Sequence, residues 1–157
     1  VLEAAAEAAG WSNPLPAGRG RGIACATDVG TVVAQVAEVS LDATGKVRVH
    51  RVTAAMDCGL VVNPDGAKAQ IEGNVMWGVG SALIEEARLE NGRFAASNFD
   101  GYPLLTMKDA PEVNAILTSS DDTMRGAGEP AIAPVAAAIG NALFDLTGKR
   151  HRQIPFK

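Results

Sequence analysis

The chain has 157 residues, a formal net charge of −4 at pH 7 and a pI near 5.1. This length is enough for one domain with its own core, and the acidic balance argues against a nucleic-acid partner, since the only basic cluster is the two arginines of residues 18–22. Hydrophobic residues make up 47% and charged residues 20%, as in ordinary globular domains, and no apolar run approaches the roughly 18 residues that span a bilayer.

The N-terminal segment predicts a short helix followed by a connector. Residues 2–9 have a helix-forming composition and end at Gly10, and residues 11–22 are rich in proline and glycine. We therefore expect residues 1–22 to be a helix remnant with a connector, and residues 23–157 to form the main domain.

Two β-branched stretches follow, Ile23–Leu41 and Val47–Met56, and both predict strands. The intervening residues 42–45 end in Gly45, which suits a hairpin loop because glycine adopts positive φ without strain. Residues 46–50 alternate between polar and apolar side chains, so we expect one face of that strand to meet solvent.

A long helix is predicted from Asn63 to about Leu83. Asn63 can cap the first free amides, and the proline that follows it suits the first helical position. The apolar stripe of this helix comprises Ala67, Ile71, Val75, Gly78 and Ala82. Because each inner glycine costs up to about 1 kcal/mol relative to alanine, we expect another element or a ligand close to the backbone at Gly73, Gly78 and Gly80.

The second half predicts a hairpin, a short strand and a final helix. Residues 84–89 and 93–96 flank an Asn-Gly turn signal, and Val113–Thr118 has the composition of a short strand. Apolar residues recur at helical spacing over Ile132–Leu146, and Gly148 supplies a C-terminal stop. These elements predict an α+β fold, with a hairpin-rich mixed or antiparallel sheet packed by two main helices.

The strongest local signal for chemistry is Glu129, which lies between a loop with Gly126 and Gly128 and the proline that follows it. The glycines allow the backbone to approach a ligand, and a proline restricts the conformation of the residue before it. A carboxylate held at a fixed loop position can act as a general base. The residues by themselves equally allow a structural role, in which Glu129 only caps the last helix and interacts with its dipole.

Gln70 is the second candidate. It lies in the second turn of the helix predicted over residues 63–83, and its amide offers a donor and an acceptor that match the paired edge groups of a heterocycle. Taken alone, the residues favour a simpler interpretation, in which Asp57 and Asn63 form a turn and a helix cap while Gln70 is solvated.

The other reactive residues give weaker signals. Cys25 and Cys58 lack metal-ligand spacing, and we expect two buried free thiols rather than a disulfide. His50 and His151 lie far apart in the sequence, so a metal site is not expected. The glycines fit neither a phosphate-binding loop nor a dinucleotide fingerprint.

An ordered series of motifs runs along the chain: Asp57-x-Gly59, Asn63-Pro64, Gln70-x-Glu72-Gly73 and Gly126-x-Gly128-Glu129-Pro130. In this combination the chain resembles the xanthine dehydrogenase family of molybdenum hydroxylases, over nearly its whole length. It is most similar to the branch that contains the large subunit of isoquinoline 1-oxidoreductase and membrane-associated aldehyde dehydrogenases. That closer resemblance is carried by residues 18–22, 97–103 and 147–150.

The resemblance implies an oxidoreductase that hydroxylates N-heterocycles or oxidises aldehydes with oxygen taken from water. It implies a molybdenum–molybdopterin cofactor, in the cytosine dinucleotide form, and a general base at Glu129 that takes the proton of the metal's hydroxyl ligand. Gln70 matches the family glutamine that hydrogen-bonds the cofactor, and Gly126 and Gly128 let the loop approach it.

In this family the large subunit is several times longer, and most cofactor contacts come from preceding segments. We therefore expect this chain to be the C-terminal part of a molybdopterin-binding subunit, with the rest of that subunit and a small iron–sulfur subunit as partners. Its two cysteines cannot bind a cluster that needs four thiolates. We expect the chain alone to bind no cofactor, to be inactive, and to self-associate through exposed apolar surface.

An alternative function is a non-catalytic interaction or scaffold domain that retains idle site residues. A start codon immediately upstream of Val1 would support this alternative, and a long upstream continuation with further cofactor loops would support the enzyme. The sequence is compatible with a cytoplasmic or a periplasmic location, since an export signal would lie upstream.

Overall fold

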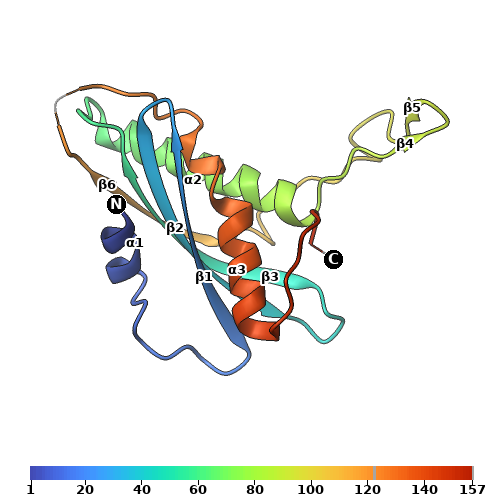
Figure 1. Cartoon of the computed structure of the whole chain (residues 1–157). Coiled ribbons are helices and arrows are strands. Elements are labelled where there is room, and N and C mark those ends of the chain that lie inside the picture. The colour runs from blue at the N-terminus through green and yellow to red at the C-terminus, as the bar shows by residue number, and fades with distance from the viewer. Residues whose placement is uncertain (122, 157) are drawn as a thin grey trace.

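The computed structural model describes residues 1–121 and 123–156. Its main element is a four-stranded sheet in the order β1-β2-β3-β6, in which β1, β2 and β3 pair antiparallel and β6 pairs parallel to β3. The predicted α+β fold, with a mixed sheet and two main helices, is confirmed (Figure 1). The elements are α1 Leu2–Ala8, β1 Arg19–Asp28, β2 Thr31–Leu41, β3 Val47–Asp57, α2 Pro64–Leu83, β4 Leu89–Glu90, β5 Arg93–Phe94, β6 Glu112–Thr118, the 3₁₀ helix η1 Pro130–Ile132 and α3 Val135–Thr147.

The two long helices cover one face of the sheet, and α1 covers part of the other. Helix α3 packs mainly on β1 and β2, whereas α2 packs nearer to β3 and β6. The core between these helices and the sheet includes the fully buried Val33, Ile71 and Ile139. On the opposite face, Ala5 of α1 packs against Val36 of β2. Strand β2 therefore carries apolar side chains on both faces, as a central strand does.

Strand β1 and helix α3 lie in direct backbone contact at two glycines. Gly20 and Gly22 face the helix, and a Cβ added at Gly22 would lie 2.1 Å from the amide nitrogen of Ala142. The residue between them, Arg21, points to the other face and donates to Glu38 Oε1 at 3.4 Å. Because side chains alternate along a strand, the Gly-Arg-Gly-Arg-Gly pattern lets α3 lie directly on the sheet.

The prediction of one continuous strand over Ile23–Leu41 is wrong, because the chain turns back at Val29 and Gly30 to form β1 and β2. These two residues have φ of 45° and 81°. A β-branched residue rarely adopts positive φ, so Val29 gave no turn signal. Strand β1 also begins at Arg19, inside the predicted connector. The β2–β3 hairpin loop over residues 42–45 is confirmed.

Helix α2 matches its prediction both in its bounds and in the face that it buries. The Oδ1 atom of Asn63 accepts a hydrogen bond from the Gly66 amide at 3.0 Å, and the helix ends at Leu83. The whole predicted apolar stripe is buried. A Cβ at Gly78 would lie 2.6 Å from the Cβ of Val135, so this glycine lets α2 and α3 pack closely.

An arm projects from the body between α2 and β6 and carries β4 and β5 at its end (Figure 1). The predicted hairpin is present, but each strand has only two residues. The turn is at Asn91 and Gly92, with φ of 52° and 78°, as an Asn-Gly hairpin turn requires. The flanking residues are exposed and have no sheet to extend them, which explains why the strands are short.

The last helix begins later than predicted. Pro130 opens the 3₁₀ helix η1, and α3 starts only after Pro134, because a proline interrupts the hydrogen-bond pattern of a continuous helix. It ends at Gly148, which has a φ of 69°. Residues 130–147 are long and apolar enough to cross a membrane, contrary to the expectation of no such run. In this fold, however, they pack on the sheet as core.

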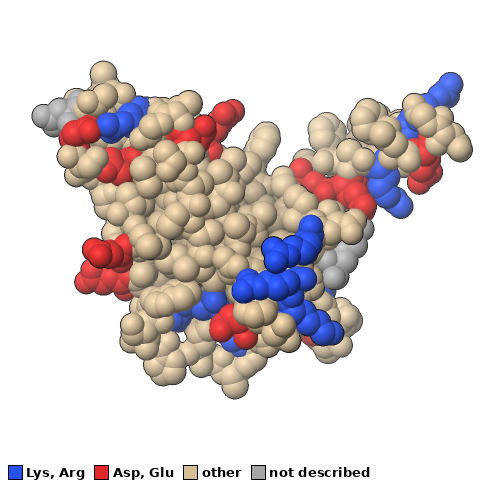
Figure 2. Space-filling model, in the orientation of Figure 1, with Lys and Arg blue, Asp and Glu red and all other residues tan. Residues whose placement is uncertain are grey.

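Basic side chains gather over the end of α3 and the segment after it (Figure 2). The guanidinium of Arg150 lies 3.5 Å from the centre of the Phe144 ring, and Lys149 follows the last turn directly. Positive charge at the C-terminus of a helix interacts favourably with the exposed carbonyls there. Arg150 also donates to Asn141 Oδ1 at 3.2 Å, so it contacts α3 directly.

Both cysteines are free thiols, as predicted. Cys58 is buried after β3, but Cys25 is exposed on β1, so the expectation that both are buried is wrong for Cys25. Strand β1 is an edge strand with solvent on part of its outer face, which the sequence pattern alone did not indicate.

Candidate active site

Gln70 and Glu129 line the same cavity, which has a volume of about 600 Å³. Gln70 comes from the second turn of α2, and Glu129 comes from the loop that leads into η1. Both residues are exposed. The predicted arrangement, with both side chains on one face and a concavity between them, is therefore present. The residues that shape the cavity include Gln70, Gly73, Asn74, Trp77, Gly128 and Glu129.

The carboxylate of Glu129 does not cap a helix. Glu129 precedes η1, and its side chain makes no hydrogen bond to the amides that follow. Its backbone carbonyl accepts from the Ile132 amide at 2.9 Å, while the next residue, Pro130, is buried. The backbone is thus anchored and Glu129 lines the cavity without making a capping hydrogen bond.

Two glycines of the cavity lining, Gly73 and Gly128, have open space where a side chain would lie. A Cβ added at Gly73 or at Gly128 would meet no other heavy atom within 4 Å. Each glycine therefore leaves room for an occupant rather than for a neighbouring element of this chain. Gly126 is different, because it does not line the cavity and a Cβ there would lie 3.2 Å from Val29 Cγ2. The structure therefore brings together three of the four predicted site residues.

Asn74 connects the two sides of the cavity. Its Nδ2 atom donates to the carbonyl oxygen of Gln70 at 2.6 Å and to that of Gly128 at 2.7 Å. One side chain therefore bridges α2 and the loop of Glu129 directly. The sequence-based prediction missed this residue, although its position one helical turn after Gln70 was a signal.

Trp77 and Asp28 also line the cavity and were missed. Trp77 is 74% exposed and lies two turns after Gln70 on the same face of α2, so helical spacing could have indicated it. Asp28 ends β1, and its position depends on the β1–β2 turn at Val29, which the sequence did not predict. A large exposed indole beside the cavity provides an apolar wall.

The Asp57-x-Gly59 motif has a local structural role. The Asp57 side chain accepts from the Gly59 amide at 2.9 Å, and Gly59 has a φ of 71°. The Arg125 amide donates to the carbonyl of Cys58 at 3.0 Å, which ties this turn to the loop before Glu129. Arg125 also pairs with Asp121 at 2.7 Å, and its hydrogen bonds are the main cause that lowers the pKa of Asp121.

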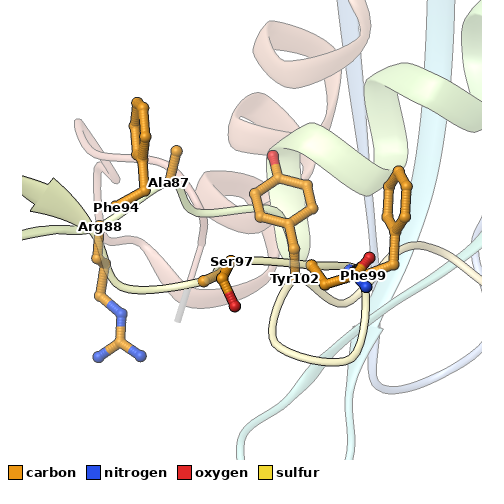
Figure 3. A pocket seen from close by; sticks show the side chains of 8 residues that line it. Ala87, Arg88, Phe94, Ser97, Phe99 and Tyr102 are labelled. Atoms are coloured by element: carbon orange, nitrogen blue, oxygen red, sulfur yellow. Dashed lines mark hydrogen bonds between the residues drawn. The ribbon is translucent and has the colours of Figure 1, made fainter.

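A second cavity of about 370 Å³ lies in the arm. The rings of Phe94, Phe99 and Tyr102 project to one side of the arm, whereas Arg88 points the other way (Figure 3). This cavity shares no lining residue with the cavity of Glu129. Within residues 1–121 and 123–156, no group of three or more His, Cys, Asp or Glu residues is placed to hold a metal ion.

Comparison with protein families identifies the domain. Residues 5–111 match the model of the molybdopterin cofactor-binding domain. The chain is 36% identical over 174 aligned residues to a nicotinate dehydrogenase chain of Pseudomonas putida, an alignment that covers 99% of this chain and 15% of that protein. It is 33% identical over 161 aligned residues to the beta chain of isoquinoline 1-oxidoreductase of Brevundimonas diminuta, covering 100% of this chain and 21% of that protein.

A membrane-bound aldehyde dehydrogenase of Gluconacetobacter polyoxogenes is 40% identical over 123 aligned residues, which cover 78% of this chain and 16% of that protein. The chain thus spans only between 15% and 21% of the length of these three relatives.

Two solved structures have the same fold. The quinoline 2-oxidoreductase of Pseudomonas putida 86 aligns with a TM-score of 0.74 and 24% identity, over 80% of this chain and 17% of that chain. The aldehyde oxidoreductase of Desulfovibrio desulfuricans aligns with a TM-score of 0.71 and 27% identity, over 80% of this chain and 14% of that chain. The chain belongs to the molybdopterin cofactor-binding domain family, within the xanthine dehydrogenase family of molybdenum hydroxylases.

Proposed function

We propose that the complete protein is a molybdenum hydroxylase that oxidises N-heterocycles or aldehydes, and that Glu129 is its general base. The observation that carries this proposal is the shared cavity of Gln70 and Glu129, in a chain of the molybdopterin-binding family. The substrate classes are inferred from relatives named for nicotinate, isoquinoline and aldehyde oxidation.

The residues of the cavity fit one side of a molybdopterin cofactor. The Gln70 side chain can donate to and accept from the polar edge of a pterin. The open backbone at Gly73 and Gly128 leaves space for a bulky group, and the cavity volume of about 600 Å³ is within the range of small-molecule sites. We propose the cytosine dinucleotide form of the cofactor. Its other contacts come from the rest of the large subunit, and electrons leave through a small iron–sulfur subunit.

When bound, the cofactor supplies a Lewis-acidic metal centre that activates water-derived oxygen and takes up the electrons of the oxidation. Glu129 accepts, at a carboxylate oxygen, the proton that the attacking oxygen loses as it bonds to the substrate carbon. Removal of this proton makes the oxygen a stronger nucleophile. Trp77 provides an apolar wall of the same cavity.

The proposal is tested with Glu129→Gln in the complete enzyme. Glutamine keeps the size of the side chain but removes its basicity, so kcat is expected to fall by about 10²- to 10⁴-fold. Molybdenum content is expected to stay at the wild-type level, because the substitution leaves the cofactor contacts in place. Glu3→Gln is the matched control, since Glu3 is an exposed carboxylate on α1, on the far face of the sheet.

Activity of Glu129→Gln within a few-fold of wild type, at equal molybdenum occupancy, would contradict the role of Glu129. That result would favour the alternative, a non-catalytic interaction domain with idle site residues. A separate measurement tests the expectation that this chain alone binds no molybdenum. It is elemental analysis of the chain purified by itself, beside the complete enzyme.

A further inference from the structure

Strand β2 carries two buried polar side chains that hold the loop of Glu129. The Oγ1 atom of Thr31 donates to the carbonyl oxygen of Gly126 at 2.6 Å, and Nε2 of Gln35 donates to that of Ala131 at 2.5 Å. Both side chains are fully buried, with 0% exposure. Because they are four residues apart on one strand, they point to the same face of the sheet.

These two bonds hold the loop on both sides of Glu129. Gly126 lies three residues before Glu129, and Ala131 lies two residues after it. The support for both bonds is rigid, since β2 pairs with β1 on one side and with β3 on the other. The backbone around Glu129 is thus hydrogen-bonded to an interior strand of the sheet.

A glutamine at the buried position 35 is not what folding stability would favour. Its two neighbours on the same face of β2, Val33 and Ala37, are apolar and belong to the main core. Its Oε1 atom is buried and, among the described residues, has no hydrogen-bond partner. An unpaired buried acceptor destabilises a fold, and an apolar side chain would avoid that cost. Within the described part of the chain, the Gln35 amide makes one hydrogen bond, and it goes to the backbone beside Glu129. This bond points to a role in holding that loop.

We propose that Thr31 and Gln35 are positioning residues, which hold the backbone of Glu129 so that its carboxylate stays within proton-transfer distance of the reacting oxygen. This inference rests on the proposed function of Glu129 as general base. A general base must lie within hydrogen-bond reach of the proton that it removes. A displacement of about 1 Å in a catalytic group can lower the rate about 100-fold.

The test compares Thr31→Val, Thr31→Ser and Gln35→Met in the complete enzyme. Valine and methionine keep approximate size and remove the donor, whereas serine keeps the hydroxyl. Thr53→Val is the matched control, because Thr53 is a buried threonine on β3 that faces away from this loop, beside Val36 of the opposite layer. Each variant is measured for kcat, KM, molybdenum content and amide hydrogen exchange over residues 126–132.

In Thr31→Val and Gln35→Met we expect at least tenfold faster exchange over residues 126–132. We also expect kcat to be about 10- to 100-fold lower, with KM within a few-fold and molybdenum content unchanged. Thr31→Ser and Thr53→Val are expected to behave like wild type in all four measurements. The exchange measurement reports on the loop itself and does not depend on turnover.

The inference is overturned if Thr31→Val and Gln35→Met keep kcat within twofold of wild type while Glu129→Gln is inactive. It is equally overturned if Thr31→Ser loses as much activity as Thr31→Val, because the hydroxyl would then be irrelevant. An active Glu129→Gln enzyme would instead reject the proposed function. If Gln35→Met does not fold, the two Thr31 variants decide the question by themselves.

Discussion

The Nδ2 atom of Asn74 lies 2.7 Å from the carbonyl oxygen of Gly128, and this contact joins helix α2 to the loop of Glu129 across 54 residues of sequence. The same atom also donates to the carbonyl of Gln70. One side chain thus links the helix of the proposed cofactor-binding amide to the loop of the proposed base. This bridge is one of the contacts that fix the relative position of the two functional groups.

Asn74→Ala is expected to affect catalysis more than stability. Asn74 is only partly buried, so the loss of its two hydrogen bonds should lower the free energy of unfolding by no more than about 1.5 kcal/mol. In the complete enzyme kcat should fall about tenfold, because the loop of Glu129 loses its tie to α2. Urea unfolding and steady-state kinetics measure both effects. Lys68→Ala, on an exposed position of α2, is the control, and equal losses in the two variants would contradict this prediction.

Gly73→Ala is expected to stabilise the chain and to impair cofactor loading. A helical glycine replaced by alanine, where the Cβ meets nothing within 4 Å, should raise the free energy of unfolding by about 0.4–1 kcal/mol. In the complete enzyme the added methyl group would project toward the cavity, so molybdenum content should fall.

Gly78→Ala is the matched control for Gly73→Ala because both glycines belong to α2. The Cβ at Gly78 would lie 2.6 Å from Val135, so this variant should be destabilised by about 1–3 kcal/mol. Urea unfolding of both variants and elemental analysis of the complete enzyme make the comparison. Full molybdenum content in Gly73→Ala would show that no occupant uses the space beside Gly73.

Glu38→Gln is expected to destabilise the fold by about 3 kcal/mol or more, because it leaves the buried Arg21 guanidinium without its carboxylate counter-charge. Glu38 is 4% exposed and contacts the guanidinium groups of Arg19, Arg21 and Arg51. The side chain of Arg21 is itself only 8% exposed. Thermal and urea unfolding measure the loss. Glu112→Gln is the control, because Glu112 is an exposed carboxylate beside the same cluster. This variant should change the free energy of unfolding by less than about 0.5 kcal/mol. A similar loss in both variants would count against a specific role of Glu38.

His50 is expected to make stability depend on pH at and below its ordinary pKa of 6.5. Its partial burial, followed by the positive charges of Arg19 and Arg48, lowers the pKa of His50, although Glu38 acts in the opposite direction. The unfolded chain therefore binds the proton more readily than the folded chain. The contribution of His50 to the free energy of unfolding is fully present above pH 6.5. It is lost as the pH falls toward the lower pKa of the folded state.

His50→Gln should remove this part of the pH dependence, together with the 2.7 Å hydrogen bond between Ser40 Oγ and the imidazole. The measurement is the free energy of unfolding in urea between about pH 5 and 8, with an imidazole titration by NMR in parallel. Substitution of the other histidine by glutamine is the control. A folded pKa of His50 above that of the unfolded chain would reverse the expected sign and contradict the prediction.

Local sequence signals were reliable where a few neighbouring residues decide the outcome. The cap at Asn63, the bounds of α2 and the turn at Asn91 and Gly92 follow from capping, periodicity and turn preference, and all three are present. The turn at Val29 and Gly30 was missed, since the positive φ of Val29 runs against its intrinsic preference. The surrounding sheet stabilises that turn, and no local pattern reports it.

The residues available for chemistry are already evident in the amino-acid sequence: a carboxylate at Glu129 between two glycines and a proline, and an amide at Gln70 on the exposed face of a capped helix. Their meeting in one cavity, and the position of Gly126 outside its lining, depend on the packing of distant segments. The bonds responsible, from Gln35 to Ala131 and from Asn74 to Gly128, join residues 96 and 54 positions apart. Such contacts depend on how α2 and η1 pack on the sheet, whereas propensity and capping act within a few residues along the chain.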